Sequence, residues 1–231
     1  MKTLSGRQQT IDTFRRAGGM MRTTQALKAG VHPRDLYALR DSGVLQRLSR
    51  GVYRLAELPP LSDPDLVTVA TRVPEAVIAV ISALHFHGLT TEISHEVSIA
   101  LPRGTARPRL DWPPLRIYRL ADSIFTTGIE IHKRDGVAIR VYSAARTVAD
   151  CFKFRNQLGV EVAIEALRSG LADRAFTVAD LHRAARLCRV DRIVRPYLEA
   201  LRGTTRRSAG NPGSADERGW HQYRRKAPGR R

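Results

Sequence analysis

The order of apolar and polar positions over the first 58 residues predicts three helices followed by a hairpin. Leu4, Ile11 and Phe14 recur at helical spacing in LSGRQQTIDTFRRAGG, which ends in two glycines. RTTQALKAG predicts a short second helix that ends at its glycine. A third helix begins at Pro33, whose missing N–H needs no partner in a first turn, and ends at Gly43. This order is typical of a helix-turn-helix.

The third helix has one apolar side and one side suited to DNA. Leu36 and Leu39 define its buried side at 100° per residue. The other side carries basic, aromatic and small residues, namely Arg34, Tyr37, Ala38 and, on the flank, Arg40. Arginine pairs with guanine O6 and N7, a methyl group meets the methyl of thymine, and a tyrosine hydroxyl reaches phosphate. The helix is therefore a candidate reader of the major groove.

The segment VLQRLSRGVYRL predicts two short strands joined by a turn at 49–51. Arg47, Arg50 and Arg54 would lie along this hairpin and contact phosphates or the minor groove. Thr23 or Thr24 is expected to cap the second helix, and both would add hydrogen bonds to phosphate. Helix and hairpin together predict a winged helix-turn-helix. The alternative is a small helical domain with a solvated basic face.

The rest of the chain predicts a mixed domain. ELPPLSDP (57–64) reads as a linker, with Asp63 or Ser62 capping the next helix. The runs HEVSIALP, LRIYRLA, IEIHKRDG and VAIRVYS predict four strands of one small sheet, and helical stripes follow from Ser143. The predicted fold class is α+β, an N-terminal winged helix-turn-helix followed by a small β-sheet and a C-terminal group of helices. The expected domains are 1–58 for DNA binding, 59–202 for the α+β domain, and 203–231 as a disordered basic tail.

Charge favours a polyanionic partner. The formal net charge of the chain is +17, and residues 1–58 hold 11 basic and 4 acidic side chains. Such a balance favours nucleic acid first and an anionic membrane second, without specifying a fold. No apolar run approaches the length of a membrane-spanning helix, so we expect no membrane association and a cytoplasmic protein. Cys151 and Cys188 lie among apolar neighbours, which predicts buried free thiols.

Three constellations suggest enzymatic chemistry, but each has a simpler interpretation. His85 and His87, with His95 nearby, point apart if they lie on a helix. Glu130 and Lys133, with Asp122 upstream, miss the acid-x-lysine spacing of nucleases by one residue. Asp63 and Asp65 are better explained as carboxylates at a helix N-terminus. The sequence therefore predicts no catalytic residue, no metal and no cofactor, and we expect no enzymatic activity.

The segment VYSAARTVADCFKFR predicts a helix capped by Ser143, with an outward basic stripe formed by Arg146, Lys153 and Arg155. Two interpretations of this stripe stay open besides a plain solvated face. It could extend the positive surface of the hairpin along DNA, or it could contact a toxin or the RNA substrate of a toxin.

The segments LYALRDSGVLQRLSRGVYRL, SALHFHGLT, VSIALPRG and YSAARTVADCFKFRNQLGVEVAIEALRSGL occur in an order that resembles the AbiEi family of bacterial type IV antitoxins. The resemblance covers roughly residues 5 to 202. It implies an N-terminal winged helix that binds inverted repeats of double-stranded DNA in its own promoter. It also implies a C-terminal domain that neutralises a nucleotidyltransferase-like toxin without a stable complex.

We therefore expect a DNA-binding antitoxin that represses its own operon. Two alternatives remain from other classes, a stand-alone winged-helix regulator without a toxin and a metal-dependent nuclease. The sequence leaves the operator and the oligomeric state open.

Overall fold

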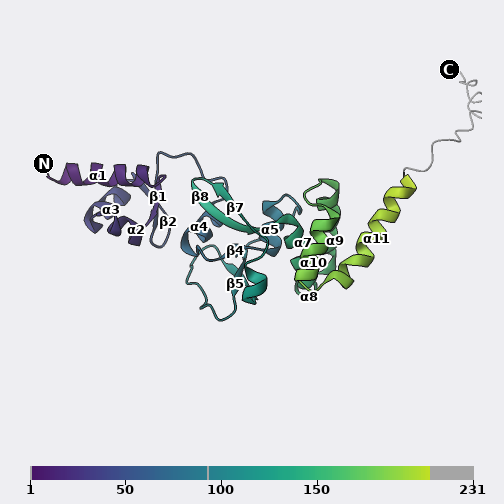
Figure 1. Cartoon of the computed structure of the whole chain (residues 1–231). Helices are drawn as coiled ribbons and strands as arrows, with labels where there is room; N and C mark the ends of the chain where they lie inside the picture. The colour runs from purple at the N-terminus through teal and green to yellow at the C-terminus, as the bar shows by residue number, and fades with distance from the viewer. Residues whose placement is uncertain (1, 93, 209–231) are drawn as a thin grey trace, which may run out of the picture.

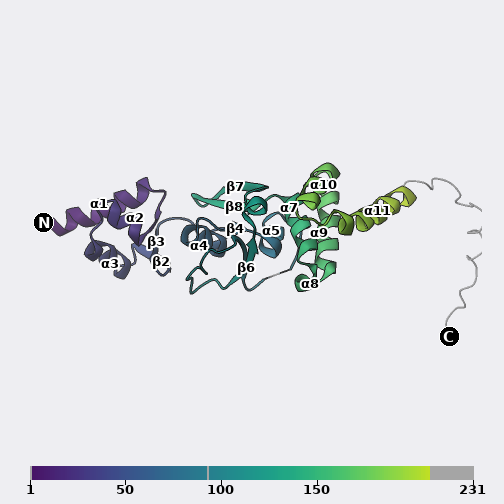
Figure 2. The same ribbon diagram turned by 60° about the horizontal axis from the view of Figure 1, so that its bottom comes forward.

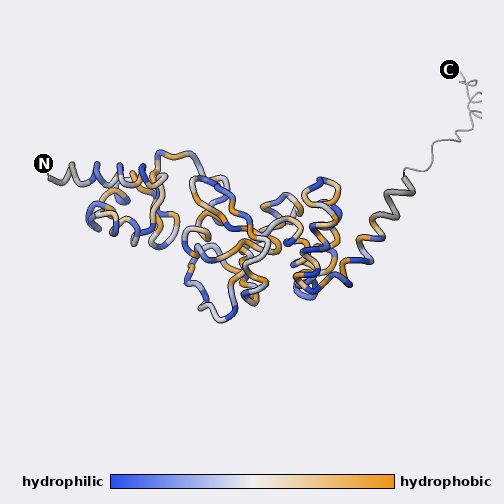
Figure 3. Tube along the Cα trace, viewed as in Figure 1, coloured by the Kyte–Doolittle hydropathy of each residue, from blue (hydrophilic) through white to orange (hydrophobic). Residues whose placement is uncertain are grey.

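The computed structural model describes residues 2–92 and 94–208, and its elements lie in three groups along one line (Figure 1). The view turned by 60° keeps the same order, with α1–β3 at one end, a sheet in the middle and helices at the other end (Figure 2). Figure 3 shows apolar and polar stretches alternating along the trace within each group. Helices and strands are mixed, so the predicted α+β class is confirmed.

The N-terminal group contains the predicted three helices and hairpin together with one strand that was not predicted. Its elements are α1 (Lys2–Arg16), β1 (Met20–Arg22), α2 (Thr23–Lys28), α3 (Pro33–Asp41), β2 (Leu45–Ser49) and β3 (Val52–Leu55). The three strands form an antiparallel sheet in the order β1-β3-β2, so β3 is the central strand. The core of this group contains Phe14, Leu36 and Leu45, each at most 1% exposed.

A five-stranded sheet forms the middle group. Its elements are α4 (Pro64–Arg72), β4 (Val77–Ile78), α5 (Val80–Phe86), β5 (Val97–Pro102), β6 (Leu115–Leu120), α6 (Asp122–Phe125), β7 (Ile129–Arg134) and β8 (Val137–Tyr142). The order is β6-β5-β4-β8-β7, with β5 parallel to β6 and β4 parallel to β8. The four predicted strands are thus present, and the short β4 joins the two pairs. Asp63 caps α4 by accepting from the Leu66 amide, as predicted.

The period of two along the strands separates the sheet's two faces. Ile99 and Leu101 belong to a core with Leu66 of α4, whereas Ala100 belongs to the core on the other face. That second core continues into the C-terminal helices. These are α7 (Ala144–Lys153), α8 (Arg155–Leu158), α9 (Val160–Ala172), α10 (Val178–Leu187) and α11 (Asp191–Ser208). Helix α11 continues past the predicted boundary at residue 202, and the predicted tail from 209 onward lies outside the described residues.

A buried ion pair lies where α7 meets the sheet. The Arg146 Nε donates to Asp150 Oδ2 at 2.9 Å, and both side chains are 1% exposed. The Arg146 Nη1 donates to the carbonyls of Ile124 and Thr127 at 3.0 and 3.1 Å. The Cys188 thiol donates to the other Asp150 oxygen at 3.2 Å, so the pair also ties in the end of α10. Burial raises the pKa of Asp150, and the Arg146 guanidinium opposes that shift.

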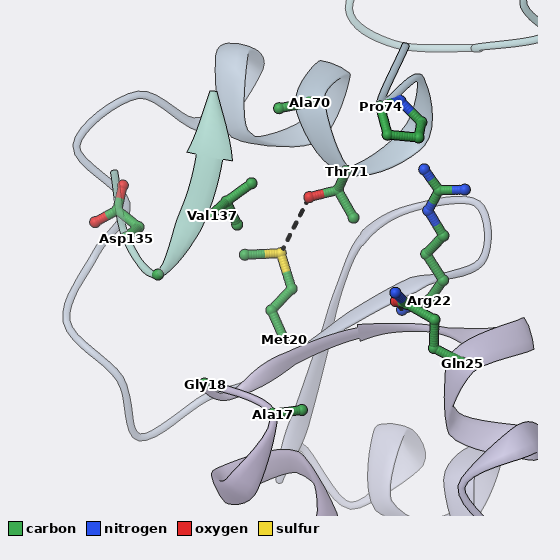
Figure 4. A pocket seen from close by; sticks show the side chains of 11 residues that line it. Ala17, Gly18, Met20, Arg22, Gln25, Ala70, Thr71, Pro74, Asp135 and Val137 are labelled. Carbon is green, nitrogen blue, oxygen red and sulfur yellow. Dashed lines mark hydrogen bonds between the residues drawn. The ribbon is translucent and has the colours of Figure 1, made fainter. Parts of the chain in front are cut away.

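A hollow of about 310 Å³ separates the N-terminal group from the middle group. Met20 and Arg22 line it from β1, facing Thr71 of α4 and Val137 of β8 (Figure 4). One sulfur contact crosses it, from the Thr71 hydroxyl to the Met20 Sδ at 3.8 Å. Helix α4 therefore contacts the N-terminal group across this hollow.

Replacing Arg146 by methionine should lower the free energy of unfolding by about 3–5 kcal/mol, because Asp150 would stay buried without its partner. Chemical denaturation measures this value. The exposed Arg168→Met on α9 is the matched control and should change stability by less than about 0.5 kcal/mol. A similar small effect for both variants would contradict a structural role of the pair.

Cys151 and Cys188 are free and buried, as predicted. Burial raises the pKa of both thiols, which keeps them protonated and unreactive. A thiol-reactive disulfide should therefore label neither cysteine quickly in the native protein and both in denaturant. Rapid labelling of the native protein would show that this core opens.

Candidate nucleic-acid interface

Helix α3 is fixed at both ends by local interactions. The His32 Nδ1 accepts from the Arg34 amide at 3.2 Å, and Pro33 occupies the first turn. Gly43, at φ +75°, turns the chain toward β2, a conformation that suits glycine. Leu36 and Leu39 are buried, as their spacing predicts, so the opposite side of α3 faces outward.

The outward side of α3 carries one unpaired cation and one paired cation. Arg34 is exposed, and Tyr37 is 44% exposed. Arg40 is half-buried, bonds Asp41 through Nε at 2.8 Å, and lies over the Tyr37 ring at 5.1 Å. The Asp41 carboxylate raises the pKa of Arg40 and neutralises part of its charge. Ala38 is half-buried between them, so Arg34 is the side chain of α3 with most freedom to contact a base.

The hairpin presents two of its three predicted arginines. Arg47 and Arg50 are exposed, and the Arg47 Nε makes only a long 3.4 Å contact to the Ser49 carbonyl. The prediction that Arg54 lies along the outside of the hairpin is wrong. Its residue is 6% exposed, and its guanidinium donates to the carbonyls of Leu58 and Pro59. Arg54 therefore turns toward the start of the linker and holds it.

The start of α2 lies against the hairpin turn. Arg22 occupies the cap position, so the prediction that Thr23 or Thr24 caps this helix is wrong. The Thr23 amide donates to the Gly51 carbonyl at 2.9 Å, which occupies that N–H within the protein. Thr24 is exposed. The contact fixes the hairpin turn relative to the helix-turn-helix.

The predicted outward stripe on α7 is also wrong. Ser143 caps the helix, as predicted, but Arg146 points inward to Asp150. Lys153 is the last residue of α7 and lies over the Phe154 ring at 5.8 Å. Arg155 belongs to α8 and donates to the Phe152 carbonyl at 3.0 Å. These three cations do not share a face.

Residues of two constellations that suggested enzymatic chemistry make hydrogen bonds within the protein. His87 bonds the Tyr142 carbonyl at 2.7 Å, and His132 bonds Glu130 at 3.0 Å. Within residues 2–92 and 94–208, no group of three or more His, Cys, Asp or Glu is placed to hold a metal ion. Over the same described ranges, no helix is long and apolar enough to cross a membrane.

The residues near the hairpin that sequence analysis missed are arginines of the middle group. Arg72 ends α4, and Arg107 and Arg109 lie in the β5–β6 connection. For two of them a signal was present, the close spacing of three arginines in PRGTARPRL, which the sequence analysis did not consider.

Comparison with known proteins finds a match for the segment that contains this candidate interface. Residues 8–56, about a fifth of the chain, match a family model described as "Transcriptional regulator, AbiEi antitoxin". The search of curated proteins gave no match. The matched segment contains α2, α3, the hairpin and every predicted DNA contact from Thr23 to Arg54, whereas VYSAARTVADCFKFR lies outside it. Residues 8–56 are thus similar to the transcriptional-regulator domain of AbiEi antitoxins.

Proposed function

We propose that this chain is the DNA-binding antitoxin of a type IV toxin-antitoxin system and represses its own operon. In this proposal residues 1–58 bind double-stranded DNA, and residues 59–202 antagonise a nucleotidyltransferase-like toxin. One observation carries the DNA-binding part. Arg34, Arg47 and Arg50 are exposed on α3 and the hairpin, and none has a carboxylate partner within the described part of the chain.

Helix α3 would enter the major groove by its N-terminal end, the end that contacts base edges in helix-turn-helix proteins. Arg34 lies one residue after Pro33 and is suited to guanine O6 and N7. Tyr37 and Ala38 lie one turn further along, within reach of a phosphate and a thymine methyl group. Arg40, held by Asp41 and Tyr37, would border the groove rather than read it.

The hairpin would supply affinity rather than sequence preference. Arg50 lies at its turn and Arg47 on β2, and both are exposed, so both are accessible to the DNA backbone. Phosphate contacts release counterions whatever the base sequence is, and they weaken with salt. Thr24, exposed at the start of α2, would add one neutral hydrogen bond to phosphate.

The antitoxin part rests on the family description of residues 8–56. In this family's pattern the toxin is a nucleotidyltransferase-like enzyme, and antitoxin and toxin would act without a stable complex. This proposal predicts that DNA binding and neutralisation of the toxin depend on different parts of the chain.

A gel shift of the full chain should show a preference of about a hundredfold or more for the DNA upstream of its own gene over a scrambled duplex of equal length. The comparison is made at about physiological salt, because affinity depends steeply on ionic strength. Equal affinity for both duplexes would mean that charge alone drives binding and would contradict the regulator assignment.

Arg34→Ala should reduce the preference for the upstream DNA by about ten- to a hundredfold, because a base contact is lost. Arg50→Ala should weaken binding to both duplexes alike and reduce the salt dependence by about one counterion. Arg168→Ala removes the same charge from the exposed side of α9 and serves as the matched control. Equal losses of preference in the first two variants would contradict the division of roles.

Expression of a neighbouring nucleotidyltransferase gene should arrest growth, and co-expression of this chain should restore it. Arg34→Ala should restore growth as well as the wild type does when both are expressed from a foreign promoter, since neutralisation does not need operator binding. A chain that binds its promoter and fails to restore growth would be a stand-alone regulator.

A further inference from the structure

A second hollow, of about 680 Å³, lies between the hairpin turn, the end of α4 and the β5–β6 connection. We call it the arginine hollow. Four arginines line it, namely Arg50, Arg72, Arg107 and Arg109, together with Pro108, Leu110 and Asp111. They come from three segments that are far apart in the sequence, so the fold brings this charge together.

Arg72 is the fixed centre of the arginine hollow. Its Nη2 donates to the Arg109 carbonyl at 3.1 Å, which holds the β5–β6 connection against α4. A Cβ atom placed on Gly51 would lie 3.4 Å from the Arg72 Nη1, so the guanidinium also lies close to the hairpin turn. Its Nε is buried and has no acceptor within the described residues. A buried donor without an acceptor is costly.

The charge of the arginine hollow is not balanced by the protein. Other arginines of the chain have carboxylate partners within 4 Å, including Arg15 with Glu57 and Arg146 with Asp150. None of the four arginines of the hollow has one in the ranges that the structure describes, and Asp111 is the one carboxylate among the lining residues. The charge of Arg72 also acts on Arg22. Burial is the main cause that lowers the pKa of Arg22, and repulsion by the Arg72 charge lowers it further.

We propose that the arginine hollow binds a phosphate group. Several guanidinium groups that converge from different segments match the three or more acceptor oxygens of phosphate, with bidentate geometry that lysine cannot provide. The phosphate comes either from the DNA backbone or from a small phosphorylated molecule. The position of Arg50 on the hairpin favours the backbone, and in that case the inference rests on the proposed function.

If the phosphate belongs to DNA, the middle group takes part in binding although it lies outside the matched segment 8–56. If it belongs to a small molecule, that molecule competes with DNA for Arg50. The two sources therefore predict different effects of the same variants.

The test uses the double variant Arg107→Gln/Arg109→Gln in the full chain. Both side chains are exposed in a connection, so the fold should persist, and thermal unfolding verifies this. Arg72 is left intact because it holds the connection in place. Arg168→Gln/Arg192→Gln removes the same charge from exposed positions of α9 and α11 and serves as the matched control.

The first arm measures affinity for the upstream and scrambled duplexes at several salt concentrations. Contact with DNA phosphates predicts a loss of about tenfold for both duplexes, with the preference between them unchanged and the salt slope reduced by about two. The second arm measures binding of inorganic pyrophosphate and of ATP by calorimetry without DNA. Loss of that binding in the variant, with DNA affinity unchanged, identifies a small phosphorylated ligand.

Two results would overturn the proposal. One is a double variant that matches the control in both arms. The other is a loss of sequence preference, which would place Arg107 and Arg109 at base edges instead of phosphate. Failure of the proposed function stays distinguishable, because it removes the preference of the wild-type chain, whereas the hollow is tested by absolute affinity and by binding without DNA.

Discussion

The buried pair of Arg146 and Asp150 is the interaction on which the larger part of the structure depends. A guanidinium at 1% exposure needs acceptors within the protein. Its Nε and Nη1 find a carboxylate and the carbonyls of Ile124 and Thr127, whereas Nη2 has no acceptor among the described residues. The guanidinium also lies 4.6 Å over the Tyr142 ring at the end of β8. The pair therefore joins α7 to the sheet, to the α6–β7 turn and, through Cys188, to α10. Loss of either charge would disturb all of these contacts.

The same requirement for acceptors decides which arginines of the chain are bonded inside the protein and which stay accessible. Arg54 donates to carbonyls and Arg146 to a carboxylate inside the protein, so neither guanidinium is accessible to a partner. Arg34 and Arg50 have no such partner among the described residues and stay exposed. A net charge of +17 thus predicts attraction to polyanions, while the internal hydrogen bonds decide which cations remain to make it. The arrangement of the arginines in the fold, rather than their number, therefore indicates where a polyanion would bind.

Sequence patterns predicted the elements whose signals are local. The cap at Asp63, the turn before β3 and the buried side of α3 each depend on neighbours in the chain. The errors arose where a distant segment decides the environment. Strand β1 has only three residues, too few for a period to show, yet it makes β3 the central strand. All four residues of β3 are buried. The burial of Arg54 was missed because its acceptors, the carbonyls of Leu58 and Pro59, lie in a segment predicted to be a linker. Arg146 was placed outside although Asp150, four residues later, was a visible signal of a pair.

The hairpin turn is held by one contact within residues 8–56, which match the family model, and by another from outside that segment. On one side the Thr23 amide holds the Gly51 carbonyl, a contact within residues 8–56. On the other side Arg72 of α4 lies against the same glycine and carries the β5–β6 connection with it. Since a phosphate contact at Arg50 requires a turn that does not move, the geometry of the matched segment depends on residues outside it. In the proposed phosphate site, the hairpin and the connection beyond it would therefore contribute to one surface.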